Sequence, residues 1–140
     1  MGVTRLDHVN ISTTRCDETR DFFVEVVGLV EGDRPPFAFP GYWLYSGDQA
    51  VIHLGGMRAE ENERATDKHG GAAIDHISFR MTGLRAMRSK LEQRGIPHHV
   101  RVVPRTGDVQ IFVDDPNGVT VELTYSAAEA GAEEKALAAR

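Results

Sequence analysis

The chain has 140 residues, 41% hydrophobic and 26% charged, which is enough to bury the core of one compact domain. Its formal net charge of −5 argues against nucleic acid or an anionic membrane as a partner. There is no bilayer-length apolar run and no signal-peptide core, and the single cysteine, Cys16, cannot form an internal disulfide, so we expect a cytoplasmic protein.

The first half of the sequence predicts a strand, a helix and three more strands. The four strands are expected at 4–12, 29–33, 42–46 and 50–54. The helix follows Thr14 or Asp17, either of which can cap it, and it ends at Gly28. Its apolar face carries Phe22, Phe23, Val26 and Val27. Gly47-Asp48 predicts a tight turn between the last two strands.

The second half repeats this order. Its strands are expected at 73–81, 98–103, 108–114 and 119–125. The helix is expected at about 83–94, and Gly95 and Pro97 end it. Its apolar face carries Leu84, Met87 and Leu91. The sequence from Asp115 to Gly118 predicts the turn before the last strand. Each half is therefore βαβββ, and the expected fold class is α+β.

These elements divide the chain into a first module at 1–54, a connection at 55–72, a second module at 73–125 and a tail at 126–140, all within one structural domain. The connection is rich in glycine and charge, which favours a solvated segment over a mobile lid. The tail is rich in alanine and glutamate and has few apolar anchors, so we expect at most a short helix that frays.

The sequence contains an internal duplication. Leu6-Asp7-His8-Val9 returns as Ile74-Asp75-His76-Ile77, an offset of 68 positions. Val51-Ile52-His53-Leu54 returns as Thr120-Val121-Glu122-Leu123, an offset of 69 positions. Three imidazoles and one carboxylate therefore occupy equivalent strand positions in the two halves.

Strand parity places these four side chains on one kind of face. Because side chains alternate along a strand, His8 shares a face with Asn10 and Ser12. Val9 and Ile11 face the other way, where they can pack under a helix. The other three strands show the same division, so we predict a metal site lined by His8, His53, His76 and Glu122. The remaining histidines lie in or beside loops and are interpreted as structural: His69, His98 and His99.

A pocket wall is expected on the same face. It comprises Trp43, Tyr45, Gln110 and Phe112. Aligning Leu44 with Ile111 makes Trp43 the counterpart of Gln110, and Tyr45 then becomes the counterpart of Phe112. Aromatic walls with one amide are typical of a pocket for a small, partly apolar molecule. The alternative is that Trp43 and Phe112 only fill the core.

The sequence around the candidate ligands resembles the vicinal oxygen chelate superfamily, which includes glyoxalase I, methylmalonyl-CoA epimerase, extradiol dioxygenases and bleomycin-binding proteins. The matching motifs are residues 6–11, 74–79 and 114–123, and the resemblance covers residues 4–125. It implies two βαβββ modules that form a cup-shaped mixed sheet with the helices on its outer face. It also implies a divalent metal in the cup, for which Zn, Ni, Fe or Mn would suit these donors. Members of this size are commonly homodimers that act on small molecules.

The resemblance also suggests roles for the site residues. Glyoxalase I usually carries a carboxylate where His53 stands, so His53 is interpreted as a fourth ligand, a general acid/base or a pocket residue. Glu122 is the expected base, removing a proton next to a carbonyl that the metal polarises. The first hypothesis is therefore a glyoxalase-like lyase or isomerase.

Three alternatives stand beside it. His8, His76 and Glu122 form a 2-His-1-carboxylate set, which suits Fe(II) in an extradiol dioxygenase. A thiol transferase of the fosfomycin-resistance type is a further option, although the sequence shows no clear basic cluster for a phosphonate. The non-enzymatic alternative is a metal-free drug-binding protein of the bleomycin-resistance type, and the four filled ligand positions count against it.

Overall fold

The computed structural model describes residues 1–2, 5–56, 74 and 76–131. The chain divides into two compact units, an N-terminal unit (Met1–Lys68) and a C-terminal unit (His69–Arg140), which are described separately below. Most of the connection expected at 55–72 and the tail beyond residue 131 lie outside the described residues.

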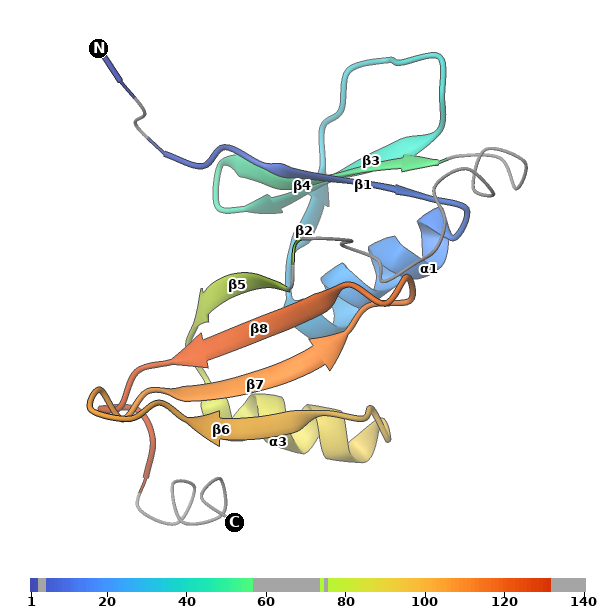
Figure 1. The fold of residues 1–140 in the computed structure, drawn as a ribbon. Helices are drawn as coiled ribbons and strands as arrows, with labels where there is room; N and C mark the ends of the chain where they lie inside the picture. Colours follow the sequence, from blue (N-terminus) through green and yellow to red (C-terminus); the bar gives the residue numbers. More distant parts are fainter. Residues whose placement is uncertain (3–4, 57–73, 75, 132–140) are drawn as a thin grey trace. The chain divides into compact units, whose positions relative to one another are not determined.

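The N-terminal unit contains a four-stranded mixed sheet and one helical segment (Figure 1). Its strands are β1 (Val9–Thr13), β2 (Val30–Gly32), β3 (Gly41–Ser46) and β4 (Gln49–Gly56). They follow the order β1-β4-β3-β2, in which β1 and β4 are parallel and the other neighbours antiparallel. The helical segment is α1 (Cys16–Asp21), continued by the π-helical η1 (Phe22–Val27). It packs against the sheet, where α1 contacts β1, β3 and β4.

The C-terminal unit repeats this topology. Its strands are β5 (His76–Met81), β6 (His99–Val102), β7 (Val109–Asp114) and β8 (Thr120–Tyr125). Their order is β5-β8-β7-β6, again with the outer pair β5 and β8 parallel. The helix α3 (Leu84–Gln93) lies between β5 and β6 in the chain and behind the sheet in Figure 1. The expected α+β fold with two βαβββ modules is confirmed.

The first helix begins differently from the prediction. Its N-cap is Arg15, and neither Thr14 nor Asp17 provides a capping side chain. Instead, Thr13 Oγ1 accepts a hydrogen bond from the Arg15 backbone N–H at 2.8 Å. The end of the helical segment is as predicted, because Gly28 adopts a φ of 101°, a conformation that residues with a side chain rarely take.

The turn before β8 forms as the sequence predicted. Asp115 Oδ1 accepts hydrogen bonds from the backbone N–H groups of Asn117 and Val119, both at 2.8 Å. This is the side-chain capture of local backbone that makes aspartate a turn residue. Gly118 follows with a positive φ of 82°, and β8 starts two residues later.

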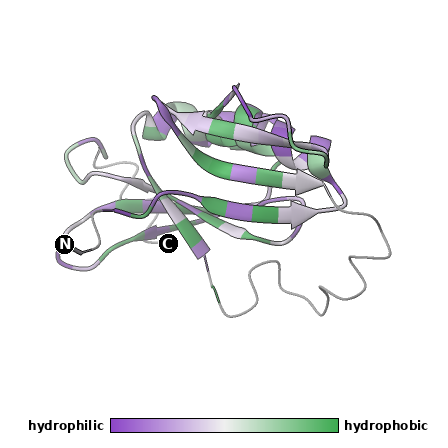
Figure 2. Ribbon diagram, turned by 90° about the horizontal axis from the view of Figure 1, so that it is seen from above, coloured by the Kyte–Doolittle hydropathy of each residue, from purple (hydrophilic) through white to green (hydrophobic). Residues whose placement is uncertain are grey.

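The core of each unit is the apolar side of its sheet together with the apolar face of its helical segment. In the N-terminal unit the buried side chains include Ile11, Phe23, Val26, Leu44, Ile52 and Leu54. In the C-terminal unit they include Leu84, Leu91, Val109, Ile111, Val121, Leu123 and Tyr125. Figure 2 shows hydrophobic and hydrophilic residues alternating along several strands, as the parity argument required. No helix in the described ranges combines the length and apolar character that a membrane crossing requires.

The segment after β8 is attached to α3. Glu129 Oε1 accepts hydrogen bonds from the backbone N–H groups of Gly83 and Leu84, at the start of the helix. A carboxylate suits this position because the first N–H groups of a helix lack partners and carry partial positive charge. This cap could not be predicted from the sequence, because Glu129 lies 45 positions beyond Leu84.

Candidate metal centre

The N-terminal unit places two of the predicted ligands side by side. His53 lies in β4, and His8 comes directly before β1, the parallel neighbour of β4. Their imidazole rings stack with centroids 3.8 Å apart and planes inclined by 10°. Trp43, opposite His53 in β3, stacks on His53 at 3.9 Å and 11°. Because each ring face has room for one partner, His53 is held between His8 and Trp43.

A hydrogen bond determines which nitrogen of His8 is free, and burial favours the neutral form of His53. His8 Nδ1 lies 2.7 Å from Asp7 Oδ2, which leaves Nε2 as the nitrogen for a metal. This hydrogen bond lowers the pKa of the Asp7 carboxyl. Burial lowers the pKa of His53, and the neighbouring His8 lowers it further. His53 is therefore favoured as a neutral imidazole, the form that binds metals.

The stacked geometry does not direct both rings at one ion. A metal bound to an imidazole nitrogen lies in the plane of that ring, about 2.0–2.1 Å from the nitrogen. Because the planes of His8 and His53 are nearly parallel and separated, an ion in one plane stays out of bonding distance of the other ring. His8 has the freer side chain, at 38% exposed, whereas Trp43 covers His53. Joint binding would require one ring to leave the stack.

The C-terminal unit brings together the other two predicted ligands. His76 begins β5, and Glu122 lies in the neighbouring strand β8, where it is only 6% exposed. His76 Nε2 and Glu122 Oε2 are 3.9 Å apart. Two donors bound to one ion at about 2.0–2.2 Å can be at most about 4.4 Å apart, so this pair fits a shared ion as it stands.

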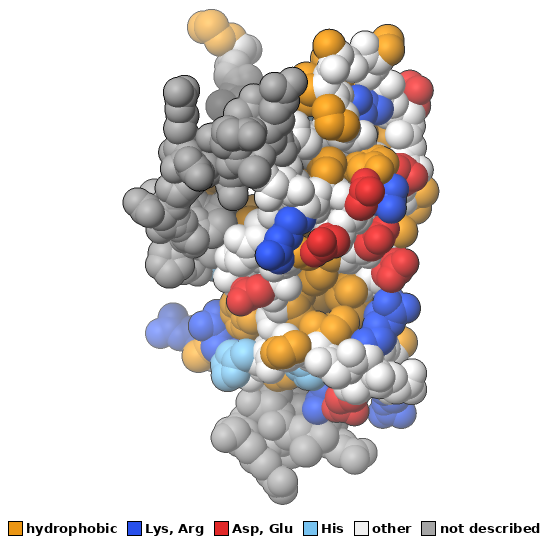
Figure 3. Space-filling model, turned by 90° about the vertical axis from the view of Figure 1, so that its right-hand side faces the viewer, with side chains coloured by type: hydrophobic (Ala, Val, Ile, Leu, Met, Phe, Trp, Pro, Cys, Tyr) orange, Lys and Arg blue, Asp and Glu red, His pale blue; other side chains and the backbone are white. Residues whose placement is uncertain are grey.

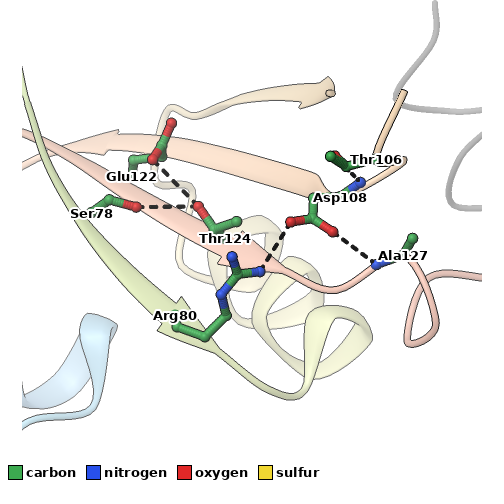
Figure 4. A network of polar contacts seen from close by, with 7 residues as sticks. All are labelled: Ser78, Arg80, Thr106, Asp108, Glu122, Thr124 and Ala127. Atoms are coloured by element: carbon green, nitrogen blue, oxygen red, sulfur yellow. Dashed lines mark hydrogen bonds and ion pairs between the residues drawn. The ribbon is translucent and has the colours of Figure 1, made fainter. Parts of the chain in front are cut away.

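Two hydroxyl groups support the Glu122 carboxylate (Figure 4). Thr124 Oγ1 donates a hydrogen bond to Glu122 Oε2 at 3.3 Å. Ser78 Oγ lies 3.2 Å from Thr124 Oγ1. The same figure shows a separate ion pair between Arg80 and Asp108 at 3.1 Å, farther along the sheet.

The strand register corrects the pairing expected between the pocket walls. Trp43 lies opposite His53, and Phe112 lies opposite Glu122. Trp43 is therefore the counterpart of Phe112, and the alignment that matched it with Gln110 is wrong. The alignment of Leu44 with Ile111 was two positions out of register, which keeps the same strand face and so could not be detected from the alternation of side chains.

Trp43, Tyr45 and His53 line one surface cavity in the N-terminal unit, with a volume of about 310 Å³. Its other residues are Arg5, Asp7, Asp48, Gln49 and Ala50. The Tyr45 hydroxyl donates to the backbone oxygen of Asp33 at 2.6 Å, so it fixes a loop as well as lining the cavity.

In the C-terminal unit, Gln110 and Phe112 share a partner that the sequence did not reveal. Arg101 of β6 donates two hydrogen bonds to Gln110 Oε1, at 2.7 and 3.2 Å, and its guanidinium lies 5.2 Å from the Phe112 ring centroid. His99, expected in or beside a loop, begins β6, and its ring centroid is 6.2 Å from that of Phe112. The alternation of His99 and Arg101 along β6 was the available signal.

An aromatic loop before β3 was also missed. Phe37 and Phe39 stack at 5.4 Å, and Phe37 lies 6.4 Å from Trp43. The Arg34 guanidinium lies 5.0 Å from each phenyl centroid. Both phenylalanines are half exposed, and Figure 3 shows hydrophobic side chains on the surface at the end of the N-terminal unit that carries this loop.

Each unit supplies two candidate donors rather than a complete site. Within either unit, the described residues contain no group of three His, Cys, Asp or Glu side chains that could hold a metal ion. The nitrogen and oxygen donors of His8, His76 and Glu122 suit a first-row divalent ion. The donor chemistry therefore fits a metal, and the C-terminal pair also fits it in geometry.

Comparisons with known proteins extend these observations. The sequence matches the Glyoxalase/Bleomycin resistance protein/Dioxygenase superfamily over residues 5–123. A relative from Arabidopsis thaliana, named Glyoxylase I 4, is 33% identical over 128 residues, which cover 88% of this chain and 71% of that protein. A glyoxalase family protein from Bacillus anthracis has a similar fold, with a TM-score of 0.70, 22% identity and coverage of 90% of this chain and 98% of that one. A lactoylglutathione lyase from Agrobacterium tumefaciens gives a TM-score of 0.65 at 19% identity, covering 94% of this chain and 100% of that one.

Proposed function

Because the chain belongs to the Glyoxalase/Bleomycin resistance protein/Dioxygenase superfamily, we propose that it is a metal-dependent lyase or isomerase that acts on a small substrate with two adjacent oxygens. The observation that carries this proposal is the close approach of His76 and the buried Glu122 in the C-terminal unit, at 3.9 Å. A carboxylate taken out of water needs a charged or polar partner, and a divalent ion beside His76 would provide one.

The proposed metal ligands are His8, His76 and Glu122. A bound divalent ion would polarise a carbonyl oxygen of the substrate and lower the free-energy barrier to removing the adjacent proton. Zn, Ni, Fe and Mn all suit this donor set.

Glu122 is the proposed base. Its carboxylate is an acceptor that Thr124 holds from one side, so it can take a proton from a carbon next to the substrate carbonyl. The low exposure of Glu122 keeps water away from this oxygen, which favours proton transfer from substrate over exchange with solvent.

His53 is proposed as a pocket residue and proton acceptor rather than a fourth ligand. It lines the cavity with Trp43 and Tyr45, and its stack with His8 directs the two ring planes away from a common ion. Its lowered pKa keeps it neutral, as an acceptor must be. The 310 Å³ cavity is of a size that suits a small molecule.

A second candidate function follows from the same stack. With His53 outside the metal's ligands, the set reduces to two histidines and one carboxylate, the arrangement used by Fe(II) oxygenases with open positions. An extradiol ring-cleaving dioxygenase is therefore the alternative enzyme. Trp43 in the N-terminal unit supplies an aromatic face beside His53, which suits a ring-shaped substrate.

Metal analysis tests both candidates. The protein, purified without added metal, is expected to retain stoichiometric divalent metal. His8→Ala and Glu122→Ala should each lose it, while the control His98→Ala, remote from the proposed ligands in sequence, should keep it. If His8→Ala and Glu122→Ala both keep their metal, the ligand assignment is wrong.

Further measurements separate the lyase or isomerase from the dioxygenase and from a metal-free binding protein. Deuterium incorporation next to the carbonyl of α-hydroxycarbonyl compounds in D₂O supports the lyase or isomerase. Stoichiometric Fe(II) with oxygen-dependent catechol turnover replaces it with the dioxygenase. A protein that takes up no metal after reconstitution belongs instead with the drug-binding members of the superfamily.

A further inference from the structure

The hydroxyl chain beside Glu122 has a fixed direction. An ionised carboxylate only accepts hydrogen bonds, so Thr124 must donate its single hydroxyl hydrogen to Glu122 Oε2. Thr124 Oγ1 can then only accept from Ser78, which makes Ser78 the donor. The order is Ser78 to Thr124 to Glu122, which runs from an exposed residue to a buried one (Figure 4).

Thr124 holds the oxygen that faces His76. Glu122 Oε2 is both the acceptor from Thr124, at 3.3 Å, and the oxygen 3.9 Å from His76 Nε2. A carboxylate oxygen has two lone pairs, so it can accept one hydrogen bond and still bind a metal. Thr124 is itself only 7% exposed, so bulk water does not readily replace its hydroxyl.

The N-terminal unit shows that the fold does not require this arrangement. In the duplicated register His53 corresponds to Glu122, and the residue two positions later, Gly55, corresponds to Thr124. Gly55 has no side chain, and a Cβ added there would lie 3.6 Å from the Phe39 ring. Asn10, the counterpart of Ser78, donates to Ser12 instead. The hydroxyl pair therefore accompanies the carboxylate and is absent beside the imidazole.

We propose that Thr124, supported by Ser78, is a positioning residue that holds the Glu122 carboxylate in its metal-binding orientation. This inference rests on the proposed function, because it takes Glu122 to be a metal ligand. A glutamate side chain has several rotatable bonds, and a charge-assisted hydrogen bond to one oxygen limits the rotation of the carboxylate. Without that hydrogen bond, the carboxylate loses rotational freedom only when the metal binds, so the affinity of the site for the metal falls.

Cobalt(II) is the probe, because its visible spectrum reports the geometry of its ligands and its titration gives the affinity. Thr124→Val keeps the shape and removes the hydroxyl, and it should weaken Co²⁺ binding about 10-fold with an altered spectrum. Thr124→Ser restores the hydroxyl and should bring both back close to wild type. Ser78→Ala removes the more distant donor and should weaken binding by about threefold.

Thr120→Val is the matched control. Thr120 lies in the same strand, two residues before Glu122, and its hydroxyl donates to Asp114 at 3.0 Å instead. It should bind Co²⁺ as wild type does. Far-UV circular dichroism and melting of the metal-free variants separate loss of folding from loss of positioning.

The outcomes distinguish the inference from the proposed function. If wild type binds Co²⁺ and Thr124→Val binds it equally well, the inference is overturned and the metal site stands. The inference is also overturned if Thr120→Val binds Co²⁺ as weakly as Thr124→Val does. It is overturned as well if Thr124→Ser fails to restore Co²⁺ binding. If wild type does not bind Co²⁺ at all, the proposed function fails and the inference fails with it.

Discussion

The two units have the same strand order and the same register around the predicted ligands, but they support those ligands by different physical means. In the N-terminal unit an imidazole is held by flat contact between His8 and Trp43. In the C-terminal unit a carboxylate is held by hydroxyl groups, through Thr124. A duplicated backbone therefore fixes where a side chain stands, and the residues around it decide what that side chain can bind.

This difference explains why only one pair fits a metal as it stands. Ring stacking sets two imidazole planes parallel, so their in-plane lone pairs do not converge. A hydrogen bond from Thr124 leaves the second lone pair of the carboxylate oxygen available, so Glu122 and His76 can share an ion. The C-terminal unit is the half that we expect to anchor the metal.

The largest expected effect is a loss of stability, and it tests whether the hydrophobic cores of the two units contribute equally to the free energy of unfolding. Leu54 and Leu123 occupy matching positions in β4 and β8, and both are fully buried. Substitution of either by alanine removes buried methyl groups and leaves a cavity, so each should lower the free energy of unfolding by about 2–5 kcal/mol in urea denaturation. Leu6→Ala, at an exposed position, should change it by less than about 0.5 kcal/mol. A small effect from only one of the two leucines would break the equivalence of the units.

The next effect separates the two equivalent ligand positions. Glu122→Gln removes the charge of the proposed ligand and should weaken metal binding about 100-fold, equivalent to about 2.8 kcal/mol. His53→Gln should change metal affinity by less than about threefold, within about 0.7 kcal/mol, because the stack keeps His53 away from the ion. Titration of both variants with Zn²⁺ in competition with a chelator measures this. Equal losses would show that His53 is a ligand and that its ring leaves the stack.

A smaller effect comes from a position where the units differ completely: Tyr125 in the C-terminal unit is the counterpart of Gly56 in the N-terminal unit. Tyr125 is fully buried, and its hydroxyl makes no hydrogen bond within the described part of the chain. Burial raises the pKa of Tyr125 well above its usual value near 10. Above about pH 10 the tyrosine of the unfolded chain loses its phenolic proton, whereas the buried tyrosine of the folded chain keeps it. The free energy of unfolding therefore falls as pH rises, by up to about 1.4 kcal/mol per pH unit.

Tyr125→Phe should remove this alkaline loss. Urea denaturation between pH 9 and pH 11 should show wild type falling relative to the variant, and the two should differ by less than about 1 kcal/mol at pH 7. A parallel decline of both proteins would mean that Tyr125 ionises normally when folded.

The smallest effect compares the glycines that end the two helical segments. Gly28 has a φ of 101°, outside the left-handed region that alanine can enter, whereas Gly95 has a φ of 62°, inside it. Gly95→Ala should therefore cost about 1 kcal/mol and Gly28→Ala more than that, measured by thermal melting. The reverse order would mean that the backbone after η1 relaxes on substitution.

The sequence predicted the order of the elements and the apolar face of the four strands that carry the candidate ligands. These features are local: alternation along β1 or β4 and the glycine after η1 depend on neighbouring residues only. The duplication also put His8 and His76 at equivalent positions, and likewise His53 and Glu122.

Only the tertiary structure decided what surrounds those side chains. The register across β3 and β4 set Trp43 opposite His53, and the register across β7 and β8 set Phe112 opposite Glu122, so the alignment made from the sequence was wrong by two positions. The support of Glu122 by Ser78 joins residues more than 40 positions apart through the pairing of β5 with β8. Local pattern therefore determined which face each candidate ligand occupies. Pairing between strands determined its partners, because contacts across a sheet depend on register, which no single segment contains.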